Sequence, residues 1–171
     1  MLTALGADRP GIINQLSSTV FDCDCSIADS RMTVLGGEFA LILMVSGNWD
    51  AIAKLEAMVP TLEEQLDLTI VSKRTNPRDN NQDKIPYEVE VVALDHPGIV
   101  NEIAKFFSEQ GLNIENMETD CYAAAHTGTP MFSITMVVSL PADISIAQLR
   151  DDFTEFCDDL NLDGSMEPAA R

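Results

Sequence analysis

A heptapeptide that occurs twice constrains this chain more than any other feature. Residues 8–14 read Asp-Arg-Pro-Gly-Ile-Ile-Asn, and residues 95–101 read Asp-His-Pro-Gly-Ile-Val-Asn. The same offset of 87 positions carries Ile27 onto Ile114. Self-similarity at so long a period indicates two similar domains in tandem, because solenoid repeats recur at 20 to 50 residues.

Each copy lies in the same order of apolar patterns, in which strand-like alternation and helical spacing follow one another. In the first half we expect strands at 1–6, 26–35, 38–46 and 67–74, and helices from residue 10 and across 49–66. In the second half we expect strands at 87–94, 113–122 and 131–140, and helices from residue 97 and across 145–160. The first half therefore predicts the order βαββαβ, and we expect the second half, as its repeat, to follow the same order. The fold class is α+β, with two ferredoxin-like domains, each an antiparallel four-stranded sheet with two helices on one face.

Local residues refine this prediction. Gly36-Gly37 predicts a tight hairpin turn, and the second half replaces it with a longer loop across 123–130. Asn48 or Asp50 is expected to cap the second helix, whose apolar face is expected to carry Trp49, Ile52, Leu55 and Met58. Pro60 is expected to break or kink that helix, because proline lacks the N–H that the helix interior requires.

A polar segment separates the two halves. Residues 75–84 include Asn-Pro and Asp-Asn-Asn and contain no apolar side chain, which is typical of a linker. We therefore predict a first domain at residues 1–74, a linker at 75–85 and a second domain at 86–171.

The repeated Asp-x-Pro-Gly allows two interpretations. It can be a helix start, with proline just inside the helix and a side-chain oxygen capping the first amides. It can also be a binding site, since free amides at a helix start suit a carboxylate and glycine lets a ligand approach the backbone. Asp8 or Asp95 would then face an ammonium group. A ligand that carries both a carboxylate and an ammonium group is a free amino acid.

Charge limits the partners of this chain. Asp and Glu number 28 against 10 Lys and Arg, which gives a formal net charge of −18. Binding to nucleic acid requires a Lys/Arg surface, so direct binding to DNA is not expected, and an effect on genes would pass through another protein. Adaptation to a saline habitat is an alternative cause of this acidity.

Other classes of function have little support in the sequence. The four cysteines include no Cys-x-x-Cys pair, so neither a metal site nor a cofactor is expected. The two histidines lie at a helix start and in a loop, without a nucleophile in the pattern of an enzyme. No apolar run is long enough to span a membrane and no signal peptide follows Met1, so we expect a cytoplasmic protein.

Three stretches resemble a known family. Asp-x-Pro-Gly-Ile between the first strand and the first helix, with Gly-Leu-Asn-Ile at 111–114, is similar to the ACT domains that sense amino acids in metabolic regulators. The start of the chain, Asp-Ser-Arg-Met at 29–32 and Leu-Gly-Gly-Glu-Phe at 35–39 resemble the two-domain transcriptional regulators of glycine cleavage within that family. The resemblance covers nearly the whole chain and is strongest across residues 3–74.

The resemblance implies where a ligand binds. ACT ligands lie where two domains meet, against the loop after the first strand, the start of the first helix and the start of the second strand. On this chain those positions are Asp8, Gly11, Asn14, Ser26, Ile27, Asp95, Gly98, Asn101, Asn113 and Ile114. Ser26 stands where the second repeat has Asn113, so the two sites are not equivalent. Our hypothesis is that the second domain binds the ligand and the first contacts a protein partner.

The resemblance also implies a mechanism. It describes an amino-acid-responsive regulator, with glycine as the ligand, that represses the glycine cleavage operon by contact with the LysR-type activator of that operon. The alternatives are an amino-acid-sensing regulatory subunit of a metabolic enzyme and an ACT scaffold that binds no ligand. Pairing of ACT domains within one chain or across a homodimer is left open by the sequence.

Overall fold

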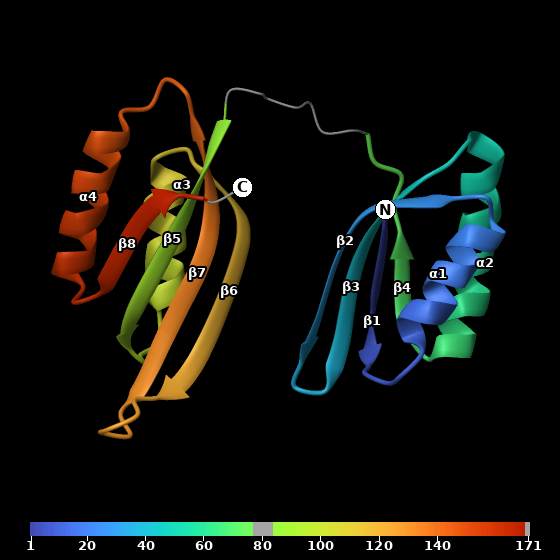
Figure 1. The fold of residues 1–171 in the computed structure, drawn as a ribbon, viewed down its shortest axis with the longest axis horizontal. Coiled ribbons are helices and arrows are strands. Elements are labelled where there is room, and N and C mark those ends of the chain that lie inside the picture. The colour runs from blue at the N-terminus through green and yellow to red at the C-terminus, as the bar shows by residue number, and fades with distance from the viewer. Residues whose placement is uncertain (77–83, 170–171) are drawn as a thin grey trace. The chain divides into compact units, whose positions relative to one another are not determined.

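The computed structural model describes residues 1–76 and 84–169, which fall into two compact units (Figure 1). The first unit extends from Met1 to Arg78 and the second from Asp79 to Arg171. Most of the predicted linker at 75–85 lies outside the described residues. Among the described residues, no helix is both long enough and apolar enough to cross a bilayer.

Each unit has the predicted order βαββαβ. Unit 1 contains β1 (Leu2–Ala7), α1 (Ile12–Asp22), β2 (Ser26–Leu35), β3 (Glu38–Ser46), α2 (Trp49–Leu66) and β4 (Thr69–Ser72). Unit 2 contains β5 (Lys84–Leu94), α3 (Ile99–Glu109), β6 (Asn113–Ala123), β7 (Pro130–Pro141), α4 (Ile146–Asp159) and β8 (Asp163–Pro168). The sheet orders β2-β3-β1-β4 and β6-β7-β5-β8 are equivalent, and every pairing is antiparallel. This is the ferredoxin-like arrangement, and it confirms the predicted fold class.

In each unit both helices lie against one face of the sheet (Figure 1). The alternation of the strands places Leu2, Ala4 and Leu41 of unit 1 on that face, where they are buried against Ile12, Leu16 and Leu55 of the helices. The core of unit 2 is aromatic. Phe106 and Phe107 of α3 pack against Phe153 and Phe156 of α4, with ring centroids 4.8 to 5.6 Å apart between the two helices.

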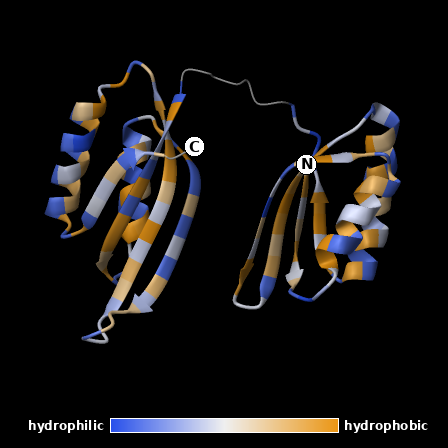
Figure 2. Cartoon of the chain, viewed as in Figure 1, coloured by the Kyte–Doolittle hydropathy of each residue, from blue (hydrophilic) through white to orange (hydrophobic). Residues whose placement is uncertain are grey.

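Figure 2 colours the residues of both sheets by hydropathy. The strand register gives the residues on the open face of each sheet, and these differ in chemistry between the two units. In unit 1 this face carries Leu5, Ile42, Met44 and Val71, whose exposed fractions lie between 38% and 59%. In unit 2 acidic side chains occupy the corresponding surface. They are Glu88, Glu90, Glu118, Asp120, Asp163 and Glu167. The open face of unit 1 is therefore apolar along β1, β3 and β4, with the exposed Asp29–Arg31 ion pair beside it on β2, and the open face of unit 2 is strongly anionic.

Two expectations about α2 are wrong, namely that Pro60 breaks the helix and that its apolar face includes the first residue. The helix runs unbroken through Pro60, because Leu55, Val59 and Leu62 bury its face. Their burial, worth about 1.5–3 kcal/mol for each side chain, outweighs a cost of roughly 3 kcal/mol for the proline. Trp49 and Met58, both expected on the apolar face, are exposed by 70% and 36%. The buried face of α2 carries Ala51, Leu55, Val59, Leu62 and Leu66.

The helix boundaries add detail to the prediction. Asn48 is the cap of α2, since its Oδ1 accepts a hydrogen bond of 2.8 Å from the amide of Ala51. Gly36 and Gly37 form the predicted tight turn with φ values of 60° and 90°. The last strand of unit 1 is shorter than predicted, because Asp67 adopts a left-handed conformation and ends α2 before β4 begins at Thr69.

Candidate functional site

The repeated heptapeptide forms the turn between the first strand and the first helix of each unit. In unit 2 the amide of Asp95 donates to the carbonyl oxygen of Pro130 over 3.1 Å, which ties the turn to the start of β7. Gly98 then takes φ 104° and serves as the N-cap of α3, a backbone conformation that glycine adopts without strain. Gly11 does the same before α1 with φ 95°.

This geometry corrects the expected helix start. Pro10 and Pro97 precede the capping glycines and so lie outside the helices, and no side chain caps either helix. The first helical hydrogen bond of α3 runs from the amide of Glu102 to the carbonyl oxygen of Gly98. The three amides before it, those of residues 99–101, therefore lack a partner within the helix. They form a positive end that can accept an anion.

A cavity of about 580 Å³ adjoins this helix start in unit 2. Its walls are His96, Gly98, Ile99, Val100, Asn101, Ala104 and Phe132. Gly98 and Asn101 are two of the predicted site residues, and Asp95 lies exposed one residue before His96. The cavity therefore combines an apolar wall, an amide side chain and free backbone amides, which is the composition of a small-molecule site.

Arg9 changes the equivalent turn of unit 1. Its guanidinium donates to the backbone oxygens of Gln65 and Leu66 over 3.4 and 3.0 Å. Those are the last carbonyls of α2, where the helix dipole is negative and a cation is favoured. In unit 2 His96 stands at this position and its Nδ1 lies 3.2 Å from the carbonyl oxygen of Pro97, next in the chain. Arg9 thus binds the end of a neighbouring helix, while His96 stays at the cavity.

The predicted residues do not gather in one place within a unit. Asp8, Gly11 and Asn14 lie at the end of the sheet where Asp8 bonds to Gly37. Ser26 and Ile27 begin β2 and pair with Ser46 and Val45 at the other end of β3. A rise of about 3.3 Å per residue puts the two groups roughly 25 Å apart.

Unit 2 repeats this separation. Asn113 pairs with Ser139 and Ile114 with Val138, whereas Asp95 contacts Pro130 at the opposite end of β7. The Asn113 side chain donates to Glu115 over 3.2 Å. The cavity therefore includes Gly98 and Asn101 of the helix start, but not Asp95, and it includes neither Asn113 nor Ile114 of the second strand.

Sequence reasoning missed several cavity residues. From the sequence His96 is expected only to lie at a helix start, although the change from Arg9 in one repeat to His96 in the other is itself a signal. Phe132 gave no local signal. It reaches the site because β7 pairs with β5, where Phe132 lies opposite Ala93, two residues before Asp95.

Comparison with known proteins agrees with this architecture. Residues 1–73 match the ACT domain family. The chain is 34% identical to the glycine cleavage system transcriptional repressor of Escherichia coli K12, over 97% of this chain and 87% of that protein.

Two crystal structures are similar over almost the whole chain. A protein from Galdieria sulphuraria superposes with a TM-score of 0.80 at 25% identity, covering 99% of this chain and 96% of the other. A protein assigned as a glycine cleavage system transcriptional repressor superposes with a TM-score of 0.78 at 29% identity, over the same shares. From its sequence and its two ACT domains, the chain belongs to the family of the glycine cleavage system transcriptional repressor.

Proposed function

We propose that this protein represses the glycine cleavage operon by binding the LysR-type activator of that operon, and that a small amino acid, glycine first among them, releases the activator. The repressor name of the relative from Escherichia coli supports the regulatory class. The observation that carries the ligand part is the cavity at the start of α3, which contains predicted residues Gly98 and Asn101.

The chemistry of that cavity suits an α-amino acid. The three amides before Glu102 donate to the carboxylate, because each is a donor without a helical partner. The side chain of Asn101 offers both a donor and an acceptor, and the exposed carboxylate of Asp95 draws the ammonium group. At about 580 Å³ the cavity also admits amino acids larger than glycine, so serine and alanine belong in any test.

The partner part rests on surface and charge. A net charge of −18 opposes binding to DNA, so regulation through a bound protein is favoured. The open sheet face of unit 1 exposes Leu5, Ile42 and Val71 together. Adjacent exposed apolar side chains of this size are typical of a protein contact surface. Unit 1 thus provides the contact with the activator, and unit 2 provides the ligand site.

Release of the activator follows from the linkage between amino-acid binding and activator binding. An amino acid shifts the equilibrium only to the extent that it binds the free repressor more tightly than the complex. A coupling free energy of about 1–3 kcal/mol weakens the complex roughly 5- to 150-fold.

Isothermal titration with glycine, serine and alanine tests the ligand site. We expect saturable binding of glycine to the whole chain and its loss in Asp95→Ala, with Asp8→Ala as the matched control that retains binding. Loss of binding in Asp8→Ala but not in Asp95→Ala would assign the site to unit 1. No heat with any amino acid would favour the ligand-free scaffold.

A pull-down with the purified LysR-type activator tests the partner. We expect the complex to form without glycine, to weaken when glycine is added, and to fail for Ile42→Lys, which places a charge in the centre of the apolar face. Thr135→Lys, on the open face of unit 2, is the control. Capture of a biosynthetic enzyme in place of the activator would support the alternative of an enzyme subunit.

A further inference from the structure

The outer edges of β4 and β8 are equivalent in the two repeats but differ in what covers them. Each strand lies at the end of its sheet and contacts the last helix of its unit. The amide of Leu68 donates to the carbonyl oxygen of Glu63, and the amide of Leu162 donates to that of Cys157. These matching bonds align α2 with α4 and β4 with β8. A difference between the two edges is therefore a difference in side chains and not in backbone.

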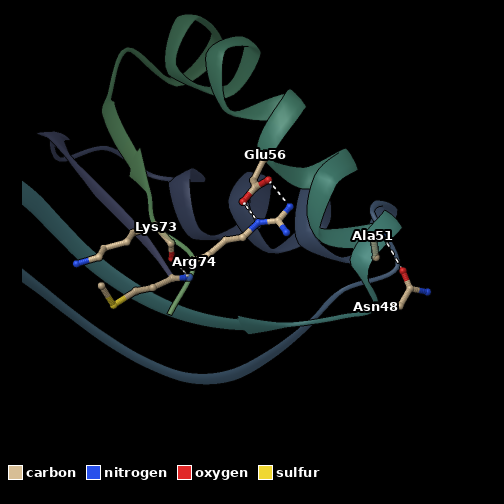
Figure 3. Close-up of polar contacts among 6 residues, drawn as sticks. Asn48, Ala51, Glu56, Lys73 and Arg74 are labelled. Atoms are coloured by element: carbon tan, nitrogen blue, oxygen red, sulfur yellow. Dashed lines mark hydrogen bonds and ion pairs between the residues drawn. The ribbon is translucent and has the colours of Figure 1, made fainter. Parts of the chain in front are cut away.

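In unit 1 a side chain of α2 covers the outer edge of β4. Lys73, which Figure 3 labels, exchanges two backbone hydrogen bonds of 2.9 Å with Met1 just after β4 ends. Bonded and non-bonded positions alternate in an antiparallel pair, so Ile70 directs its N–H away from β1. That N–H donates to Oε1 of Glu63 over 2.7 Å. The outward amide of β4 is thus satisfied within its own unit.

Both carboxylates that α2 uses along this edge are replaced in α4. Glu56 holds the end of the strand, since Arg74 donates to its two carboxylate oxygens over 2.9 and 2.8 Å (Figure 3). The residues of α4 equivalent to Glu56 and Glu63 are Arg150 and Cys157. A guanidinium has no acceptor and a thiol accepts only weakly, so neither can bond an outward amide as Glu63 does.

The outer edge of β8 is open at the equivalent place. The amide of Ala169 donates to the carbonyl oxygen of Pro86 over 3.0 Å, which fixes which positions of β8 bond to β5. By the same alternation, the N–H and C=O groups of Gly164 and Met166 point away from β5. Within the described part of the chain, neither of these two amides has a side-chain or loop partner. Such a row of outward backbone groups is a template for a further strand.

A small cavity of about 200 Å³ lies along this edge. Arg150, Phe153 and Thr154 of α4 line one side of it, and residues 164–167 of β8 line the other. Pockets for whole ligands start at roughly 300 Å³, so this one suits a single side chain. A strand paired with β8 would direct every second side chain to the helix side of the sheet, beside this cavity. The cavity therefore suits one side chain of an added strand.

The open face beside β8 favours a basic strand. Asp163 and Glu167 belong to β8, and Glu88 of β5 lies directly opposite Glu167. Within the described part of the chain these carboxylates form no ion pair. Lysine or arginine on an added strand would pair with them, because opposite charges on neighbouring strands stabilise a sheet. A second copy of β8 would bring more carboxylates to the same place, which opposes self-pairing.

We propose that β8 binds an extended basic segment of another protein, which adds a strand to the sheet of unit 2. Its backbone pairs with Gly164 and Met166, and its lysine or arginine side chains lie beside Glu88 and Glu167. An uncharged side chain on the other face enters the cavity next to Arg150. This surface is separate from the open face of unit 1, and β4 does not share the property because a carboxylate of α2 occupies its edge.

Calorimetric titration of the whole chain with a short peptide tests the proposal. The probe is acetyl-Lys-Thr-Lys-Val-Lys-Thr-amide. Its threonine and valine residues face the helix side, as Gly164 and Met166 do, so their N–H groups bond to β8. The matched control has the same charge but carries N-methyl groups on those residues. We expect saturable binding of the probe and a loss of about 10-fold or more in affinity for the control.

Two charge reversals locate the peptide on the sheet. Glu167→Lys and Glu118→Lys change the net charge equally, but Glu118 lies on β6 at the far edge of the sheet. Glu167→Lys should weaken binding about 10-fold, and Glu118→Lys should weaken it less than about 3-fold. Circular dichroism checks that both variants fold.

Amide hydrogen exchange of the parent protein provides a measurement without substitutions. Exchange at Gly164 and Met166 should slow when the probe peptide is added, because both amides then form hydrogen bonds. The proposal is overturned if the probe and its N-methylated control bind equally, if the two lysine variants behave alike, or if the newly protected amides lie on another strand. Absence of saturable binding would overturn it as well.

Discussion

Arg9 and His96 occupy the same position in the two repeats, yet they affect the neighbouring helix start in different ways. Arg9 reaches the last carbonyls of α2, whereas His96 keeps to its own turn and lines a cavity with Gly98 and Asn101. The backbone of the turn is almost the same in both units, with φ 95° at Gly11 and 104° at Gly98. The change from Arg9 to His96 therefore gives two turns of nearly the same backbone different contacts: one binds the end of α2 and the other lines a cavity.

The two sheets likewise share their strand order and buried face but differ in the side chains of their open faces. Both have the same strand order and the same helix-covered face. Their open faces carry apolar side chains in unit 1 and carboxylates in unit 2. Packing constrains the buried positions of each repeat, while the exposed positions are free to take a separate task. The two repeats therefore share a fold, and they differ in the exposed surfaces that can carry separate functions.

The cores provide the prediction with the largest effect. Phe107 of α3 and Val20 of α1 are equivalent, and both are buried. Phe107→Ala should lower the free energy of unfolding of unit 2 by about 3–5 kcal/mol, because a large aromatic cluster loses a member. Val20→Ala should cost unit 1 only about 1–2 kcal/mol. Urea unfolding by circular dichroism, with Trp49 fluorescence reporting on unit 1, measures both. Equal costs would remove the distinction between an aromatic and an aliphatic core.

The capping glycines come next. Neither Gly11 nor Gly98 has an atom within 4 Å of an added Cβ, so alanine there strains only the backbone. Gly11→Ala and Gly98→Ala should each destabilise their unit by roughly 1–3 kcal/mol. Only Gly98→Ala should also weaken binding of glycine, as measured by calorimetry. A loss of binding in both variants would mean that both turns take part in the site.

Exchanging Arg9 and His96 between the two turns tests whether these side chains cause the difference between the turns. Arg9→His should lower the free energy of unfolding of unit 1 by about 0.3–1 kcal/mol, since the C-terminus of α2 loses its cation. His96→Arg should weaken glycine binding by placing a longer side chain at the cavity. The urea midpoint from Trp49 fluorescence and the calorimetric affinity measure these effects. An unchanged midpoint for Arg9→His would show that its hydrogen bonds to α2 contribute no stability.

The last prediction concerns alkaline pH. Burial among apolar groups raises the pKa of the Cys157 thiol of unit 2 from its ordinary value of 9.0 to about 11. Between these values the folded thiol keeps its proton while the unfolded one loses it, so the stability of unit 2 should fall as pH rises from 9 to 11. Cys157→Ala should flatten this dependence relative to the parent in urea titrations. Burial also raises the pKa of Cys25 in unit 1, which predicts a change of the same sign there. A parallel fall in both the parent and Cys157→Ala would exclude the thiol as its cause.

Much of the fold follows from the sequence, because its signals are local. The repeat at Asp8 and Asp95, the alternation of the strands and the double glycine of the hairpin each act within a few residues. The sequence also predicted Gly98 and Asn101 at the start of α3. It misplaced Trp49 and the effect of Pro60, because both depend on what the rest of α2 packs against.

The sequence alone thus determined two βαββαβ units, their antiparallel sheets and the turns that begin their first helices. Tertiary structure decided that Ser26 and Asn113 lie at the opposite end of the sheet from those turns, that Arg9 reaches Leu66, and that Phe132 joins Asn101 at one cavity. The reason is physical. Spacing along a chain fixes which face a side chain takes, but strand register and the packing of helices fix which distant residues meet.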